Sequence, residues 1–167
     1  MSTPKLQPSK ALRIAPSNTI EIPYPNPLSS GNNTSVTANK LVCSTATFIT
    51  NDVKIGDVVY NNGATNPTIA TVTAVDSQTQ LSLSANIFTA QPVAFNVYPS
   101  AASAGRVDSP ILYIGAGGTV VVETDGGDQV AFVGAPAGSI LPVMVRKLLI
   151  AGPGGTTTTA TNINALW

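Results

Sequence analysis

The chain has 167 residues, enough for one domain or two very small ones, and only 10% of them are charged, with a net charge of +0. Its eight scattered Lys and Arg residues do not form the cationic cluster that phosphate binding needs, so we expect no nucleic-acid partner. With no histidine and one cysteine, the sequence excludes an internal disulfide, a Cys/His zinc site and a histidine-dependent catalytic pair. We expect Cys43 to be a small buried apolar residue.

We expect a soluble chain without a membrane partner. Met1–Lys10 lacks the apolar core of a secretory signal, and Met1–Gln7 is predicted to be a mobile tail. The most apolar stretch, Ile140–Ile150, is interrupted by proline and two cations and is too short to span a bilayer. Because only 10% of the residues are charged, the surface must be rich in uncharged polar residues, which is typical of β-rich proteins that assemble.

Six prolines exclude a helix from the first thirty residues. Between them, Ala11–Ile14 and Thr19–Ile22 are predicted to be short strands, and Pro25–Val36 has the composition of a linker. We expect the two strands to return to the protein's own sheet rather than lie on a neighbouring subunit. For Tyr24–Ser35 both arrangements remain open.

The middle of the chain, Lys40–Tyr98, is predicted to be a small unit of short strands. Turn signals such as Asn61-Asn62-Gly63 separate segments in which apolar residues alternate with polar ones. Five or six strands in about sixty residues predict a small antiparallel barrel or sandwich. The predicted strands are Leu41–Cys43, Val58–Tyr60, Ile69–Val75, Leu81–Leu83, Ile87-Phe88 and Val93–Tyr98.

The last third of the chain has β-branched runs punctuated by glycine, the pattern of strands joined by tight turns. Alternation places Val120 and Val122 on one face of a strand, with Val121 and Glu123 on the other. Asp125–Asp128 is predicted to be a hairpin turn. The predicted strands are Ile111–Gly115, Thr119–Thr124, Gln129–Val133, Ile140–Ile150, which is long enough to cross a sheet, and Thr161–Trp167.

The order of motifs in this last third resembles the small spike-base proteins of tailed-phage and gene-transfer-agent heads. The motifs are Leu112-Tyr113-Ile114-Gly115, Val120-Val121-Val122, Gly127-Asp128-Gln129-Val130, Pro136–Val143, Arg146 and Thr161–Trp167, preceded by Ala15–Thr19. In that family the segment like Ala15–Thr19 is joined to the LYIG strand by a short connection. In this chain a long stretch separates the two, so the resemblance implies an insertion. The run Val53–Phe88 resembles small β-modules of phage virion proteins. The spike-base family is structural, so the resemblance implies no catalytic residue.

We therefore expect an all-β fold, with a small antiparallel sandwich or barrel as a base domain and a second β-module inserted in it. Residues 1–37 would supply the extended arm and first strands of the base, 38–99 the inserted module, and 100–167 the rest of the base. Insertion is tolerated where the two ends of an element lie close together at the surface.

No constellation in the sequence predicts a catalytic, cofactor or metal site. Asp125–Asp128 lacks the ligand spacing of a calcium loop, and the glycines of Gly115–Gly118 precede a strand instead of a phosphate-binding helix. Gly152–Gly155 lacks the Lys-Ser/Thr of a phosphate-binding loop. Asp52 and Asp57 are predicted to be solvated turn residues, and the Thr156–Thr159 tract is predicted to be flexible.

The resemblance implies a non-enzymatic virion structural protein, a capsid decoration, cement or head-spike-base protein at the capsid surface. The expected partners are the protein itself, as a homotrimer or homopentamer, and the major capsid protein or another virion protein. A tail, baseplate or fibre attachment protein is the first alternative, and a carbohydrate-binding β-module the second. Because Trp is enriched at interface hot spots, we predict that Ile163, Leu166 and Trp167 form the assembly contact, with packing of Trp167 on its own domain as the alternative.

Overall fold

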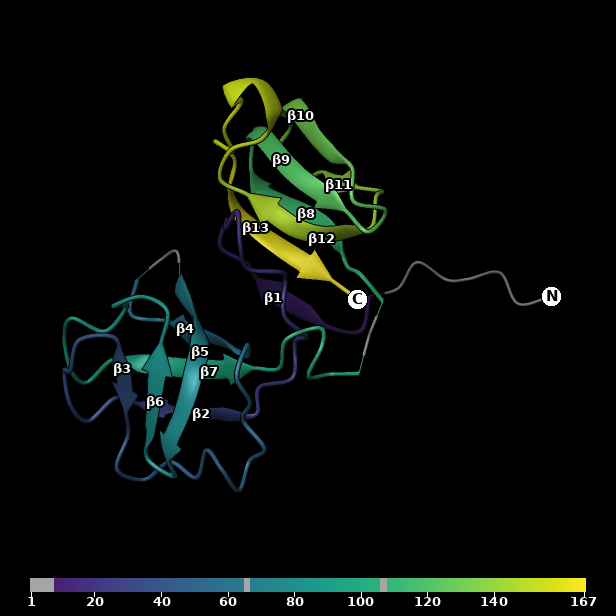
Figure 1. The fold of residues 1–167 in the computed structure, drawn as a ribbon. Helices are drawn as coiled ribbons and strands as arrows, with labels where there is room; N and C mark the ends of the chain where they lie inside the picture. The colour runs from purple at the N-terminus through teal and green to yellow at the C-terminus, as the bar shows by residue number, and fades with distance from the viewer. Residues whose placement is uncertain (1–7, 65–66, 106–107) are drawn as a thin grey trace. The chain divides into compact units, whose positions relative to one another are not determined.

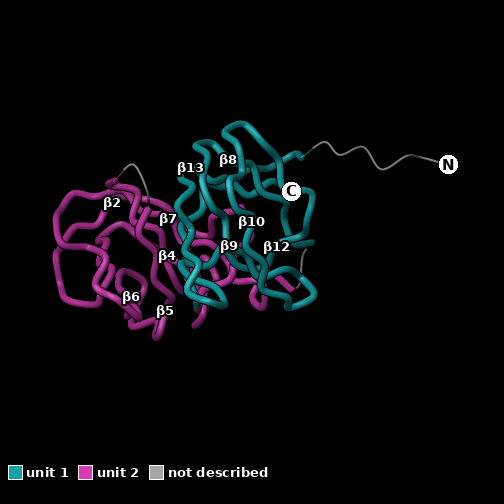
Figure 2. The backbone as a smooth tube through the Cα atoms, turned by 90° about the horizontal axis from the view of Figure 1, so that it is seen from above, with its two compact units in different colours: residues 1–18, 108–167 teal, residues 19–107 magenta. Residues whose placement is uncertain are grey.

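The computed structural model describes residues 8–64, 67–105 and 108–167, so the predicted mobile tail, Met1–Gln7, lies outside the described residues. The described chain is all-β, with a single 3₁₀ turn at Pro153–Gly155 (Figure 1). It forms two compact units, one of Met1–Asn18 with Asp108–Trp167 and one of Thr19–Val107 (Figure 2). Residues 19–37 and 100–105, grouped above with the base domain, thus belong to the second unit.

The first unit contains two antiparallel sheets. The four-stranded sheet has the order β1-β13-β8-β11, with β1 at Ala11–Arg13, β8 at Ile111–Ala116, β11 at Ile140–Leu141 and β13 at Thr161–Leu166. The three-stranded sheet has the order β10-β9-β12, with β9 at Gly118–Thr124, β10 at Gln129–Ala135 and β12 at Val145–Leu149.

The two sheets of the first unit pack as a small sandwich. In Figure 2, β8 and β13 lie on one side of this unit and β9 and β12 on the other. Every second residue of β8 and β13 is buried, which places one face of the four-stranded sheet on the core. The buried residues of the two sheets include Leu112, Ile114, Ile163, Ala165, Val120, Val122 and Leu148.

The prediction of one long strand over Ile140–Ile150 is wrong. The chain forms β11 in the four-stranded sheet, breaks over residues 142–144, and continues as β12 in the other sheet. Pro142 has no N–H to donate to a ladder, so the strand ends there and the chain changes sheets. This change of sheet leaves β11 with only two residues, Ile140 and Leu141.

The second unit is one curled sheet with the order β2-β7-β4-β5-β6-β3. Its ends approach each other, because the Thr34 amide donates to the Val42 carbonyl and Ser35 forms a bridge with Val42. Three phenylalanines, Phe48, Phe88 and Phe95, fill its interior together with the buried Cys43, as predicted for that residue. The strands are β2 (Ser29–Asn32), β3 (Lys40–Val42), β4 (Val58–Asn61), β5 (Thr68–Ser77), β6 (Gln80–Leu83) and β7 (Ala94–Tyr98).

Three local predictions for the second unit are wrong. Pro25–Val36 is not only a linker, because it contains β2, which pairs with β7. The sequence of β2, Ser-Ser-Gly-Asn, has little β propensity. Thr19–Ile22 is not a strand, and the prolines that follow it cannot donate to a ladder. Ile87-Phe88 is also outside the strands, yet Phe88 is completely buried because its ring packs in the core against Phe95.

Candidate assembly surface

Two of the predicted assembly residues, Ile163 and Leu166, lie on β13, a central strand between β1 and β8, and Trp167 directly follows it. Ile163 points into the sandwich and is 3% exposed, so its side chain is already packed within its own unit. Leu166 is three residues further along the strand, so its side chain points to the other, outer face of the sheet, where it is half-buried. The structure therefore separates two of the three predicted residues onto opposite faces of the same strand.

Trp167 is joined by its backbone to the chain just before β1. Its amide donates to the Lys10 carbonyl at 3.0 Å, and its own carbonyl accepts from the Ser9 amide at 2.6 Å. The Trp167 side chain is half-buried. These bonds hold the C-terminal residue beside the N-terminal strand, so any assembly contact here is made by the side chain and not by a detached tail.

The Thr156–Thr159 tract before β13 is not a flexible polar segment, contrary to the prediction. The Thr158 hydroxyl donates to the Leu149 carbonyl at 2.6 Å and accepts from the Val121 amide at 2.9 Å. The Thr159 hydroxyl accepts from the Thr119 amide at 2.9 Å. These hydroxyls bond backbone groups of β9 and the end of β12, which fixes the tract to the three-stranded sheet.

The outer face of the four-stranded sheet carries apolar side chains from several strands. Leu166 lies between Ala11 and Ile111 in the register, and Ile140 lies opposite Tyr113. Ile140 is 46% exposed, while Ile111 and Tyr113 are half-buried. We call Leu166, Ile111, Tyr113 and Ile140 the outer-sheet patch. The sequence signal for Ile111 and Tyr113 was the alternation of their strand, which places them opposite the buried Leu112 and Ile114.

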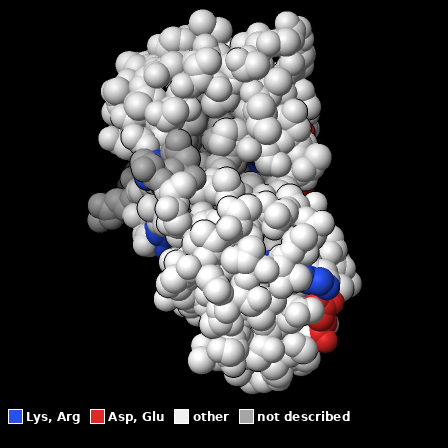
Figure 3. All heavy atoms as spheres, turned by 90° about the vertical axis from the view of Figure 1, so that its left-hand side faces the viewer, with Lys and Arg blue, Asp and Glu red and all other residues white. Residues whose placement is uncertain are grey.

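Few charges accompany the outer-sheet patch. Arg13 on β1 lies on the same face, and its guanidinium donates to the side-chain carbonyl of Asn162. Figure 3 shows one face of the molecule, on which the atoms of charged side chains are sparse. Apolar side chains on a surface with so little charge are typical of proteins that pack against partners.

The ionic cluster of the first unit is structural and lies on β9 and β12. Glu123 is buried, its carboxylate accepts from Nε of Arg146 at 2.9 Å, and the Lys147 ammonium lies 3.3 Å away. The hydrogen bond from Arg146 lowers the pKa of Glu123 below its usual value. These interactions tie β12 to β9 within the three-stranded sheet.

We expect the first unit to lose stability in acid through Glu123. Because its pKa is lowered by folding, the carboxylate contributes stability above its unfolded pKa of about 4.3, and that stability is lost as pH falls through the lower folded value. Thermal unfolding followed by the fluorescence of Trp167 should show this loss below about pH 4. Glu123→Gln should flatten the pH dependence, whereas Asp76→Asn in the other unit should leave it unchanged. An equally steep curve for Glu123→Gln would contradict the assignment.

Asp57 is not a solvated turn residue, contrary to the prediction. Its carboxylate is completely buried in the second unit and accepts from the backbone amides of Lys54 at 2.8 Å and Ser100 at 3.0 Å. Asp52 is exposed and pairs with the Lys54 ammonium at 2.9 Å. The two carboxylates thus have separate structural partners, and their arrangement does not form a catalytic dyad.

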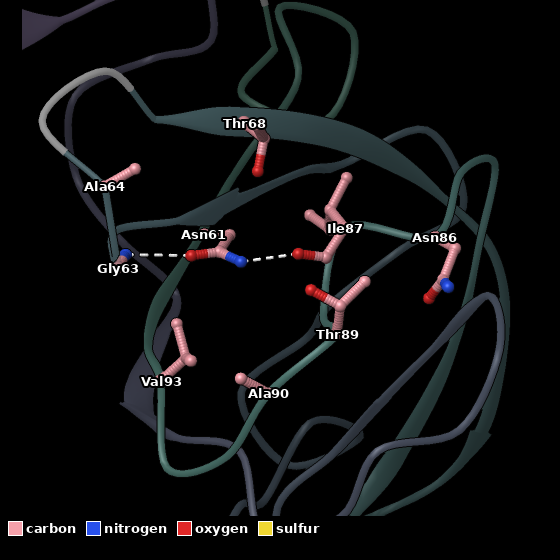
Figure 4. A pocket seen from close by; sticks show the side chains of 9 residues that line it. All are labelled: Asn61, Gly63, Ala64, Thr68, Asn86, Ile87, Thr89, Ala90 and Val93. Atoms are coloured by element: carbon pink, nitrogen blue, oxygen red, sulfur yellow. Dashed lines mark hydrogen bonds between the residues drawn. The ribbon is translucent and has the colours of Figure 1, made fainter.

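A hollow of about 400 Å³ lies in the second unit near the end of β4 (Figure 4). Its polar side chains include Asn61 and Thr68, and its apolar ones include Ile87 and Val93. Asn61 is already used, because its carbonyl accepts from the Gly63 amide at 2.8 Å and its amide donates to the Ile87 carbonyl. The described lining has no charged and no aromatic side chain, so it presents no stacking surface for a sugar.

Within the described residues, no three His, Cys, Asp or Glu side chains gather closely enough to hold a metal ion. The same residues contain no helix with the length and hydrophobicity of a membrane-spanning segment. The chain matches no protein-family model, no curated protein and no solved structure.

Proposed function

We propose that this chain is a non-enzymatic structural protein of a tailed-phage virion. In this proposal it decorates or stabilises the capsid, or forms the base of a head spike, by assembling into a closed homo-oligomer. The observation that supports assembly is the outer-sheet patch, an apolar surface with little charge next to Trp167. The virion assignment rests on the resemblance of the ordered motifs in the last third of the chain, which the fold gathers into one compact unit.

The partners in this proposal are further copies of the chain, as a homotrimer or homopentamer, and the major capsid protein or another virion protein. Cyclic symmetry is the common form of homo-oligomers and suits attachment at a symmetry axis of a shell. Leu166 and Trp167 are the residues expected at the contact between copies. Ile163 does not take part in this contact directly, but its buried side chain anchors β13 in the core.

Attachment to the tail, baseplate or fibre is the runner-up within the same class. A carbohydrate-binding β-module is the alternative from another class, and the hollow beside Asn61 is where a sugar would sit. Sugar sites need an aromatic wall, and the hollow has none. We therefore expect no saturable binding on a glycan array, and saturable binding would favour the alternative.

Labelling of this chain in intact particles tests the proposal. A gold-labelled tag inserted at Thr37, an exposed turn residue of the second unit, should appear at regular positions on the capsid surface. Label on the tail would support the runner-up. Absence of the chain from purified particles would contradict the virion assignment itself.

A further inference from the structure

One sheet edge in the first unit is long and uncovered. The outer edge of β12 is covered by the N-terminal segment, since the Ser17 amide donates to the Leu148 carbonyl at 2.7 Å and the Asn18 side chain accepts from the Ile150 amide. β1 has three residues and β11 has two. β10, with seven residues, is the edge left open in the described part of this unit.

The hydrogen-bond pattern identifies which groups of β10 point away from the sheet. The Thr124 amide donates to the Asp128 carbonyl at 2.9 Å, so residues 128, 130 and 132 bond to β9. The backbone N–H and C=O groups of Gln129, Ala131 and Val133 must then point to the open edge. A row of such groups is a template for another strand.

Both faces of β10 carry exposed side chains, although Phe132 is half-buried and Ala135 is buried. Val133 is 79% exposed and Val130, which faces the sandwich interior, is still 38% exposed. The interior side is open because residues 136–139 connect β10 directly to β11, which is only two residues long and cannot cover it. From Gln129 to Phe132 the strand carries no charge, no proline and no bulge, the devices that normally protect an edge, and a register shift between Phe132 and Ala135 marks a bulge only near its end.

We propose that β10 pairs antiparallel with β10 of a second copy across a two-fold axis at Ala131. Ala131 would then exchange both hydrogen bonds with its own counterpart, and Gln129 would do so with Val133 of the second copy. On the interior side, Val130 would lie opposite Phe132 of the second copy, a β-branched and aromatic pair that stabilises antiparallel sheets. The two three-stranded sheets would become one continuous sheet.

The distribution of charge and of free edges favours a second copy as the occupant. The acidic turn lies at one end of β10, so antiparallel pairing separates the two Asp128 carboxylates by roughly 20 Å, beyond the Debye length. In the described part of the second unit the two end strands, β2 and β3, have only four and three residues, so neither is a comparable edge for a head-to-tail contact. Two β10 edges are the matching long edges that two copies can present.

This contact is separate from the outer-sheet patch of the proposed function. A single strand pair buries less than the ~1,200 Å² of a standard interface, so we expect reversible, concentration-dependent dimerisation in solution. Because neighbouring copies in a cyclic trimer or pentamer are not related by a two-fold axis, this contact would join copies that belong to separate oligomers.

Cysteine crosslinking tests the register. Paired residues at a hydrogen-bonded position have Cα atoms about 5.5 Å apart, within the range that a disulfide spans. Under mild oxidation Ala131→Cys should therefore form a covalent dimer at least tenfold faster than Val133→Cys, which faces Gln129 of the second copy. The double variant Gln129→Cys/Val133→Cys should crosslink as fast as Ala131→Cys. The native Cys43 is buried and does not interfere.

A charge variant tests the association without a covalent bond. Ala131→Lys places two ammonium groups against each other on the axis and should shift the dimerisation constant at least tenfold in sedimentation experiments, while Thr37→Lys in the other unit should not. Equal crosslinking rates for Ala131→Cys and Val133→Cys, or unchanged self-association of Ala131→Lys, would overturn the proposal. Neither result depends on where the protein lies in a particle, so this proposal and the virion assignment fail separately.

Discussion

Deletion of Asn164–Trp167 is expected to unfold the first unit and not merely to separate subunits. Asn164, Ala165 and Leu166 are the residues of β13 that pair with β1 on one side and β8 on the other. Without them β1 loses its entire partner, and the completely buried Ala165 leaves a gap in the core. The loss of most of two strand pairs exceeds what a domain with about 5–15 kcal/mol of total stability can tolerate.

Hydrogen exchange resolved by segment is the measurement for this deletion, because it reports each unit separately. Amides of β8 and β9 should lose protection, while those of β4 and β5 should keep it. The matched control removes only Trp167, or replaces Leu166 by Lys, which should preserve protection and lower the oligomer mass in sedimentation experiments. A protected β8 in the deletion variant would contradict the central role of β13. An unchanged mass in the control variants would remove Leu166 and Trp167 from the assembly contact.

Phe95→Ala is expected to destabilise the second unit by about 3–5 kcal/mol, the usual cost of deleting a buried aromatic ring. Phe95 is 1% exposed, and its ring centroid lies 6.0 Å from that of Phe48 and 6.5 Å from that of Phe88. Its truncation leaves a cavity where the other two rings meet, between β7 and the opposite wall of the curled sheet. Urea unfolding measured by circular dichroism gives the change in free energy.

Ile55→Ala is the matched control for Phe95→Ala, because Ile55 lies in the same unit and is 69% exposed. Its effect should stay within about 0.5 kcal/mol, as for other surface substitutions. Phe95→Leu keeps part of the side-chain volume, so its loss of unfolding free energy should fall between those of the other two variants. A loss of less than about 1 kcal/mol for Phe95→Ala would show that the three phenylalanines do not form a close-packed core.

Much of the strand pattern could be predicted from the sequence. Glycine turns and β-branched runs mark β8, β9 and β10 to within two residues, because a tight turn needs residues that tolerate positive φ. The period of two matches burial in β8, whereas β9 is buried on both faces. The lack of histidine and the single cysteine exclude whole classes of sites without any structure. The buried state of Cys43 was also predictable, since an isolated cysteine behaves as a small apolar residue.

Other features depend on contacts between distant segments and leave little trace in the local sequence. Ser29–Asn32 has no strand signal and becomes β2 because β7 offers it a free edge, while Asp57 is buried because it caps the amides of Lys54 and Ser100.

The sequence by itself determined an all-β chain without histidine chemistry, because composition and the period of two are local properties. Only the tertiary structure decided which face each strand presents and which edges stay open. It placed Ile163 in the core and Leu166 outside, divided Ile140–Ile150 between two sheets, and left one edge of β10 open in the described part of the first unit. The physical reason is that burial and strand pairing are set by partners far away in the chain.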